Sequence, residues 1–173
     1  LDRWVSSGRA MPLFSCSSRS RRTLTAFREA WRDLRARAPH LDVVDTDNHL
    51  IRRYVPKTGR IERIAGTGKK GNAIGTSPET TELNFPHGVY VHPDGTLYIA
   101  ELSKISKVEK AEDNLDSPAK LTTIYDNLPK DEAHGWKFIA IGPDNKLYIP
   151  VGQPGNNVLH DNDHGLIRRI NLD

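Results

Sequence analysis

The side chain best suited to chemistry in this chain is His134, in the stretch Ala133-His134-Gly135-Trp136-Lys137. An imidazole titrates near neutral pH, so a histidine held beside a substrate can accept the proton of a hydroxyl group. Apolar Ile139 and Ile141 follow at alternate positions, which predicts that His134 lies in a loop just before a strand. A solvated loop histidine without a catalytic role is the competing interpretation.

Other chemically capable groups lie nearby in the sequence. Trp136 could stack on a flat ligand, although packing is the more common role of an aromatic at a strand start. Glu101 could supply one ligand to the metal of a hydrolase, but no companion ligand is identifiable. A loose cluster of acids and histidines lacks recognisable metal-ligand spacing, so we expect a solvated loop at His160, Asp161, Asp163 and His164.

Two further stretches resemble ligand-binding motifs and fail on inspection. Gly66-Thr67-Gly68-Lys69-Lys70-Gly71 lacks the spacing of a phosphate-binding loop. Asp45-Thr46-Asp47 begins like a calcium loop, but His49 occupies the next ligand position and no glycine follows. Neither stretch predicts a site.

The elements that position His134 belong to an internal repeat. The two clearest copies are residues 89–101 and 139–151, fifty residues apart. Each copy predicts a strand, a tight turn containing Pro-Asp, and a returning strand, with Gly95 or Asn145 at the turn position that requires positive φ. A period of about fifty residues with several short strands is typical of β-propeller blades.

An earlier partial copy begins at Leu41, with later strands expected at residues 50–53 and 60–64, and residues 166–169 repeat the third strand. The predicted fold is therefore all-β, an incomplete propeller of about two to three blades over residues 41–173. A propeller needs at least four blades. We expect the chain to be a fragment, or to assemble with other copies or another chain.

Residues 41–105 resemble the NHL-repeat family of β-propellers. The matching residues are Val44-Asp45-Thr46-Asp47-Asn48-His49-Leu50-Ile51-Arg52, then Ile64-Ala65-Gly66-Thr67-Gly68, and then Leu83-Asn84-Phe85-Pro86-His87-Gly88. In this family the Gly66 stretch makes a connection between blades. The resemblance implies architecture rather than one activity, because the fold carries many functions.

Residues 125–173 resemble the glucose/sorbosone dehydrogenase family. The resemblance is carried by residues 128–144, by 146–152 and by the ending Leu166-Ile167-Arg168-Arg169-Ile170-Asn171-Leu172-Asp173, with the spacing from His134 to Gly142-Pro143-Asp144 the most specific element. It implies a propeller that oxidises a sugar or polyol with pyrroloquinoline quinone and calcium, with His134 as the general base. One departure is Ala133, where some members carry an acid.

The leading functional hypothesis is thus part of a quinone-dependent sugar or aldose dehydrogenase-like propeller, inactive as an isolated fragment. A non-catalytic NHL-type module that binds a protein or carbohydrate is the alternative, and a lactonase-like hydrolase is the third candidate. His134 is the catalytic candidate, and the cofactor-binding residues are not identifiable. The dehydrogenase resemblance also favours a periplasmic or secreted location.

Residues 1–40 differ from the rest of the chain, with nine Arg, no Lys and three acidic residues. The Ser- and Arg-rich composition up to Arg22 predicts disorder. Leu24, Phe27, Trp31 and Leu34 recur at helical spacing, which predicts one short amphipathic helix over about residues 23–38. The basic segment could bind an anionic surface, but a solvated tail is the simpler interpretation and no nucleic acid partner or membrane span is expected.

Overall fold

The computed structural model describes residues 40–111, 118–156 and 163–172. The basic segment and the helix predicted over about residues 23–38 lie outside the described residues. The division of the chain at residue 40 therefore stays a prediction.

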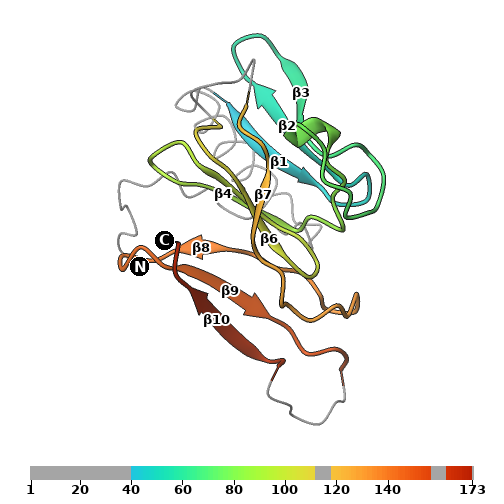
Figure 1. Cartoon of the computed structure of the whole chain (residues 1–173), viewed down its shortest axis with the longest axis vertical. Coiled ribbons are helices and arrows are strands. Elements are labelled where there is room, and N and C mark those ends of the chain that lie inside the picture. Colours follow the sequence, from blue (N-terminus) through green and yellow to red (C-terminus); the bar gives the residue numbers. More distant parts are fainter. Residues whose placement is uncertain (1–39, 112–117, 157–162, 173) are drawn as a thin grey trace, which may run out of the picture.

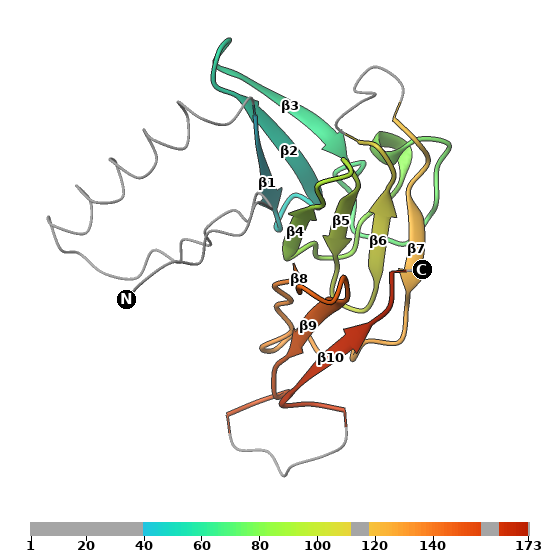
Figure 2. The same cartoon turned by 90° about the vertical axis from the view of Figure 1, so that its left-hand side faces the viewer.

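The described residues form three antiparallel sheets, which follow one another along the molecule (Figures 1 and 2). The first sheet has the order β1-β2-β3, the second β4-β5-β6-β7, and the third β10-β9-β8. The prediction of an all-β, incomplete propeller is confirmed. The strands are β1 (Leu41–Asp45), β2 (Leu50–Val55), β3 (Arg60–Ala65), β4 (Gly88–Val91), β5 (Leu97–Ala100), β6 (Ile105–Val108), β7 (Thr122–Tyr125), β8 (Ala140–Ile141), β9 (Leu147–Val151) and β10 (Leu166–Ile170), with one 3-10 turn, η1 (Pro78–Thr80).

The repeat predicted from the sequence is present as two equivalent hairpins. Val91 pairs with Leu97 in the β4–β5 hairpin, and Ile141 pairs with Leu147 in the β8–β9 hairpin. The closing turns contain Gly95 at φ 85° and Asn145 at φ 55°, the positive-φ conformation expected at both positions. The fifty-residue offset therefore relates two blades of the same construction.

The other strands form the first sheet and add further strands to the two hairpins. β1, β2 and β3 occupy the second, third and fourth strand positions of a first blade, and β10 pairs with β9 as the predicted third strand. β6 and β7 were not predicted as strands. In the described part of the chain no helix has the length and hydropathy to cross a bilayer.

Two hydrophobic clusters join the three sheets. The first contains Ile51 of β2 and Leu97 and Ile99 of β5. The second contains Tyr98 and Ala100 of β5 together with residues of β9 that point back toward it, Leu147, Ile149 and Val151. Successive residues of β5 thus pack on opposite neighbours, as strand geometry requires. Each buried aliphatic side chain contributes about 1.5–3 kcal/mol.

Candidate functional site

His134 lies in the loop that precedes β8, as predicted, and its backbone conformation is unusual. Its φ is 52°, in the left-handed region that few residues other than glycine adopt. The next residue, Gly135, donates its N–H to the carbonyl oxygen of Glu132 at 3.2 Å. A Cβ atom on Gly152 would lie 2.5 Å from the carbonyl oxygen of His134, so glycine allows the end of β9 to approach the loop. The loop is held by close backbone contacts.

The imidazole of His134 is exposed and oriented by one contact. Its Nδ1 lies 3.2 Å from the backbone carbonyl oxygen of Gln153. A carbonyl oxygen only accepts hydrogen bonds, so Nδ1 carries the proton in this contact and Nε2 of the neutral ring is an acceptor. No second hydrogen bond to His134 occurs within the described residues. The arrangement presents Nε2 as a base toward solvent.

Lys137 lies beneath this loop as a buried cation. Its side chain is 1% exposed, and its Nζ donates to the carbonyl oxygen of Gly135 at 2.6 Å. Burial lowers the pKa of the ammonium group, and the nearby charge of Asp131 opposes part of that shift. Lys137 therefore anchors the residue that directly follows His134. Its burial could not be predicted from the sequence, because it depends on the neighbouring sheet.

His87 is the residue opposite Lys137 when the two repeats are aligned, and the two lie close together in the fold. Burial and, second, the charge of Lys137 lower the pKa of His87 to about 4. Its Nδ1 is buried and has no hydrogen-bond partner within the described residues. The ring stacks on Phe85, with 6.4 Å between the centroids. His87 is thus a neutral histidine in a half-buried position at neutral pH.

Trp136 and Phe138 lie on the outside of this loop and strand start. Trp136 is 66% exposed and Phe138 is 43% exposed. The expectation that Trp136 packs within the chain is wrong, because the residues around it in the loop turn inward instead: Gly135 and Lys137 are buried. Two exposed aromatic residues therefore follow His134 within four positions of the chain.

The acidic residues that precede His134 are engaged elsewhere. Glu132 accepts a hydrogen bond from Nζ of Lys70 at 2.7 Å, and Asp131 lies 3.1 Å from Nε2 of His164. Asp163 pairs with Arg168 at 2.9 Å. His160 and Asp161 lie outside the described residues. Within the described ranges, no three His, Cys, Asp or Glu side chains converge on a possible metal position.

Glu101 is a structural residue in this fold. It is fully buried, and its Oε2 accepts the N–H of Asn84 at 2.6 Å while its Oε1 lies 3.4 Å from Nζ of Lys104. Burial raises its pKa against the opposing effect of these contacts. Both oxygens are used inside the chain, so the structure gives no support to the metal-ligand role considered for the lactonase-like candidate.

The two rejected motifs also have structural roles. The N–H of Gly66 donates to the carbonyl oxygen of Pro78, and a Cβ atom on Gly66 would lie 2.2 Å from the carbonyl oxygen of His49. Lys70 lies over the ring of Phe85 at 4.2 Å, which ties this segment to the second blade. Asp45 binds Arg52 at 2.6 Å. The Gly66 segment therefore contacts the second blade, and Asp45 joins two strands of the first sheet.

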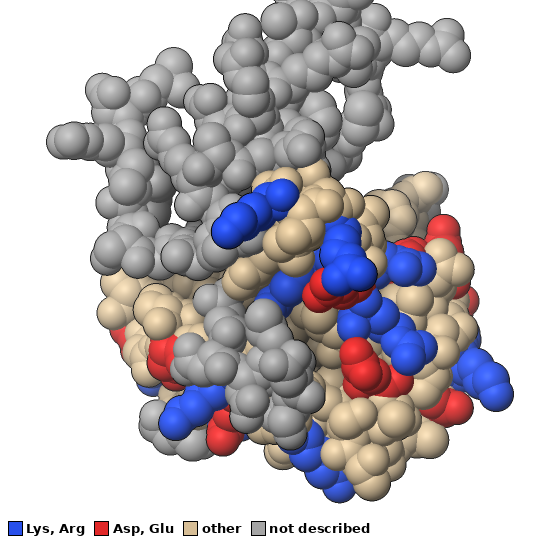
Figure 3. Space-filling view, turned by 90° about the horizontal axis from the view of Figure 1, so that it is seen from above, with Lys and Arg blue, Asp and Glu red and all other residues tan. Residues whose placement is uncertain are grey.

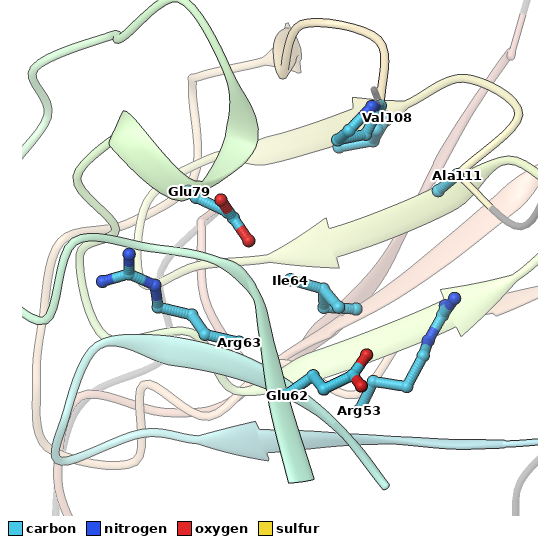
Figure 4. A pocket seen from close by; sticks show the side chains of 8 residues that line it. Arg53, Glu62, Arg63, Ile64, Glu79, Val108 and Ala111 are labelled. Carbon is cyan, nitrogen blue, oxygen red and sulfur yellow. The ribbon is translucent and has the colours of Figure 1, made fainter. Parts of the chain in front are cut away.

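A cavity of about 440 Å³ lies away from His134, between the first and second sheets. Figure 4 shows Ile64 of β3 and Glu79 of η1 directed into it from different sides. Among its lining residues is Arg53, which is 1% exposed and binds Asp42 through Nε and Nη2 at 2.7 and 2.8 Å. Figure 3 shows basic and acidic side chains interspersed on the visible described surface, so that face carries no patch of a single charge.

Comparisons with known proteins address the fold. No protein-family model matches the chain. A Bos taurus protein described as NHL repeat-containing protein 2 is 39% identical over 62 residues, which is 35% of this chain and 8% of that protein. The PQQ-bound aldose sugar dehydrogenase of Streptomyces coelicolor aligns with a TM-score of 0.53 at 21% identity, over 77% of this chain and 41% of that one.

The chain thus spans well under two thirds of the length of either similar protein. At 21% identity the structural likeness establishes the fold alone. The predicted resemblances are confirmed at that level: the chain is part of a β-propeller like that of an aldose sugar dehydrogenase, and it has sequence similarity to an NHL-repeat protein.

Proposed function

We propose that these blades belong to a quinone-dependent sugar or aldose dehydrogenase-like propeller, in which His134 accepts the proton of the substrate hydroxyl. The observation that carries the proposal is the orientation of His134. Its protonated Nδ1 faces the carbonyl oxygen of Gln153, and the ring is exposed. A general base needs a free nitrogen within reach of the hydroxyl proton, and Nε2 meets that requirement.

The described residues fit one side of such a site. Trp136, two residues after His134, has an exposed ring, which is suited to stacking on an aromatic cofactor or on the apolar face of a sugar. No carboxylate cluster for calcium occurs in the described ranges, and the ammonium group of Lys137 is buried against Gly135. We therefore assign proton acceptance alone to this chain and derive no step that involves calcium.

In the proposed reaction, the substrate hydroxyl or hydrated aldehyde donates a hydrogen bond to Nε2 of His134 and loses its proton to that nitrogen. Pyrroloquinoline quinone, when bound, supplies the acceptor for the hydride that leaves the adjacent carbon. The imidazolium formed on His134 is stabilised by its Nδ1–H contact with the Gln153 carbonyl oxygen, since the bond strengthens when the donor becomes charged. The positive φ of His134 sets the direction in which the side chain leaves the backbone, and the Gln153 contact orients the ring.

The test uses the complete propeller that contains these blades, loaded with pyrroloquinoline quinone and calcium. Dye-linked oxidation of aldoses should fall by at least about 100-fold in His134→Asn, the range expected for loss of a general base. Asparagine tolerates positive φ, so it separates loss of the base from backbone strain, whereas His134→Ala combines both. Unchanged quinone binding together with unchanged turnover in His134→Asn would exclude the proposed role.

A second measurement needs this chain alone. Nitrogen-15 spectra of the histidine rings report which nitrogen carries the proton. We expect the neutral ring of His134 to populate the Nδ1–H form, because the Gln153 carbonyl oxygen can only accept. A dominant Nε2–H form would remove the physical basis for the base.

A non-catalytic NHL-type binding module is the second candidate, favoured by the similarity to the Bos taurus NHL repeat-containing protein. Such a module needs neither a free base nor a cofactor. If the complete propeller takes up no quinone in an absorbance titration and oxidises no aldose, this candidate replaces the dehydrogenase.

A further inference from the structure

The loop before β8 contains a buried cation whose hydrogen bond goes to the loop itself rather than to a carboxylate. Lys137 is 1% exposed, and its one hydrogen bond among the described residues is donated to the carbonyl oxygen of Gly135 at 2.6 Å. Asp131, whose charge reaches the ammonium group, contacts His164 instead, at 3.1 Å. An ammonium group without an ion-pair partner is costly to bury, and methionine would fill a similar volume without that cost. Packing alone therefore does not account for the charge of Lys137.

The carbonyl group that receives this hydrogen bond belongs to the turn that carries His134. Nζ of Lys137 holds the peptide group that follows Gly135. The peptide group that precedes Gly135 is held through its N–H, which donates to the carbonyl oxygen of Glu132 at 3.2 Å. Its carbonyl oxygen, that of His134, faces Gly152, where a Cβ atom would lie 2.5 Å away. Both peptide groups beside Gly135 are thus fixed, and Lys137 fixes one of them.

The backbone conformation of His134 requires such support. Its φ is 52°, and a residue other than glycine stays in the left-handed region only where its surroundings determine the conformation. The second blade has a left-handed residue in the corresponding loop, Phe85 at φ 46°, and there the N–H of Phe85 donates to Nδ1 of His49 at 3.3 Å. His87, opposite Lys137 in the repeat, has no hydrogen-bond partner for its Nδ1 in the described part of the chain. Each blade therefore supports its left-handed turn with a different side chain.

We propose that Lys137 is a positioning residue for His134. Its ammonium group holds the Gly135 carbonyl oxygen and keeps the turn in the conformation in which Nδ1 of His134 reaches the carbonyl oxygen of Gln153, 3.2 Å away. Without the charge, the peptide group after Gly135 can rotate, His134 relaxes from the left-handed region, and the contact that selects its Nδ1–H form weakens. The positioning is a property of this chain, whereas its effect on turnover rests on the proposed function.

Nitrogen-15 spectra of the histidine rings in the full chain test the positioning directly. In Lys137→Met the ratio of the Nδ1–H to the Nε2–H form of neutral His134 should fall by at least about threefold, as expected for the loss of one hydrogen bond. Lys130→Met is the matched control, because it removes the same charge from an exposed position of the same loop and should leave the ratio unchanged. Lys137→Gln, which keeps a donor without the charge, should shift the ratio in the same direction and replaces Lys137→Met if circular dichroism shows that the methionine variant is unfolded. An unchanged ratio in the folded Lys137 variant, or an equal change in Lys130→Met, would overturn the proposal.

Turnover of the complete propeller, loaded with pyrroloquinoline quinone and calcium, separates this inference from the proposed function. Lys137→Met should lower kcat by about tenfold or more while quinone binding is unchanged, because the base is misplaced rather than removed. In the His134→Asn background the same substitution should cause no further loss, since a positioning residue acts through His134. A further tenfold loss in the double variant would show that Lys137 acts independently and would overturn the inference. If His134→Asn alone leaves turnover unchanged, the proposed function fails, and the ring spectra still decide whether Lys137 positions His134.

Discussion

Replacing His87 with glutamine should make the folded chain less sensitive to acid. The pKa of His87 is about 4 in the fold, against 6.5 for an unperturbed histidine. Between these values the unfolded chain binds a proton that the folded chain does not bind, so the stability of the fold declines as the pH falls from 6.5 toward 4. The linkage relation gives a loss of about 2 kcal/mol between pH 7 and pH 5, and nearer 1 kcal/mol once solvent screening of this half-buried ring is included.

The assay is urea unfolding at pH 7 and at pH 5, followed by circular dichroism of the β-sheet backbone. All other titrating groups are shared by the wild type and His87→Gln, so the difference between their pH dependences isolates His87. We expect the free energy of unfolding of the wild type to fall by about 1–2 kcal/mol more than that of the variant. Equal losses in the two proteins would refute the reasoning.

Lys137→Met tests the cause of the depressed pKa of His87. The two named causes are burial first and the charge of Lys137 second. Methionine preserves the length of the side chain but removes the charge. In a titration followed by NMR, the midpoint of His87 should rise above about 4 and stay below 6.5, since burial persists. An unchanged midpoint would show that the Lys137 charge does not reach His87.

Two further predictions concern stability. Asp42→Ala should destabilise the fold by about 3–5 kcal/mol, because it leaves the 1%-exposed Arg53 without its anion. Asp45→Ala on the same strand is the control and should cost at most about 1 kcal/mol, since its partner Arg52 is partly exposed. Equal losses of unfolding free energy in urea would contradict this prediction. Ile149→Ala should lower the free energy of unfolding by about 2–5 kcal/mol, because it leaves a cavity between the second and third sheets. A decrease below about 1 kcal/mol in urea unfolding would show that the sheets do not pack tightly there.

The sequence was sufficient to predict the hairpins because their signals are local. The Pro-Asp turns and alternating aliphatic residues predicted the pairs β4–β5 and β8–β9, and the early copy predicted β1, β2 and β3. β6 and β7 escaped prediction. β6 reads Ile-Ser-Lys-Val, with weak alternation, and β7 begins with two threonines. β6 pairs with β5 and β7 pairs with β6, and this pairing gives both segments strand structure that local preference does not specify.

The candidate site was predictable only in part, for the same reason. His134 and its position before a strand follow from spacing along the chain. Its contact with Gln153 joins residues nineteen apart, which spacing along the chain does not predict. The burial of Lys137 and the depressed pKa of His87 depend on how the second and third sheets meet, which sequence periodicity does not encode. Trp136 was expected to pack and is exposed.

The two junctions between sheets contain different buried cations. Arg53 and its partner Asp42 lie where the first sheet meets the second, and Lys137 lies beside His87 where the second meets the third. Blades of similar sequence can misassemble during folding by pairing with the wrong neighbour. An exchanged neighbour would bring a buried cation against a surface not shaped for it, at a high desolvation cost. We expect these two buried charges to specify the order in which the similar blades pack on one another.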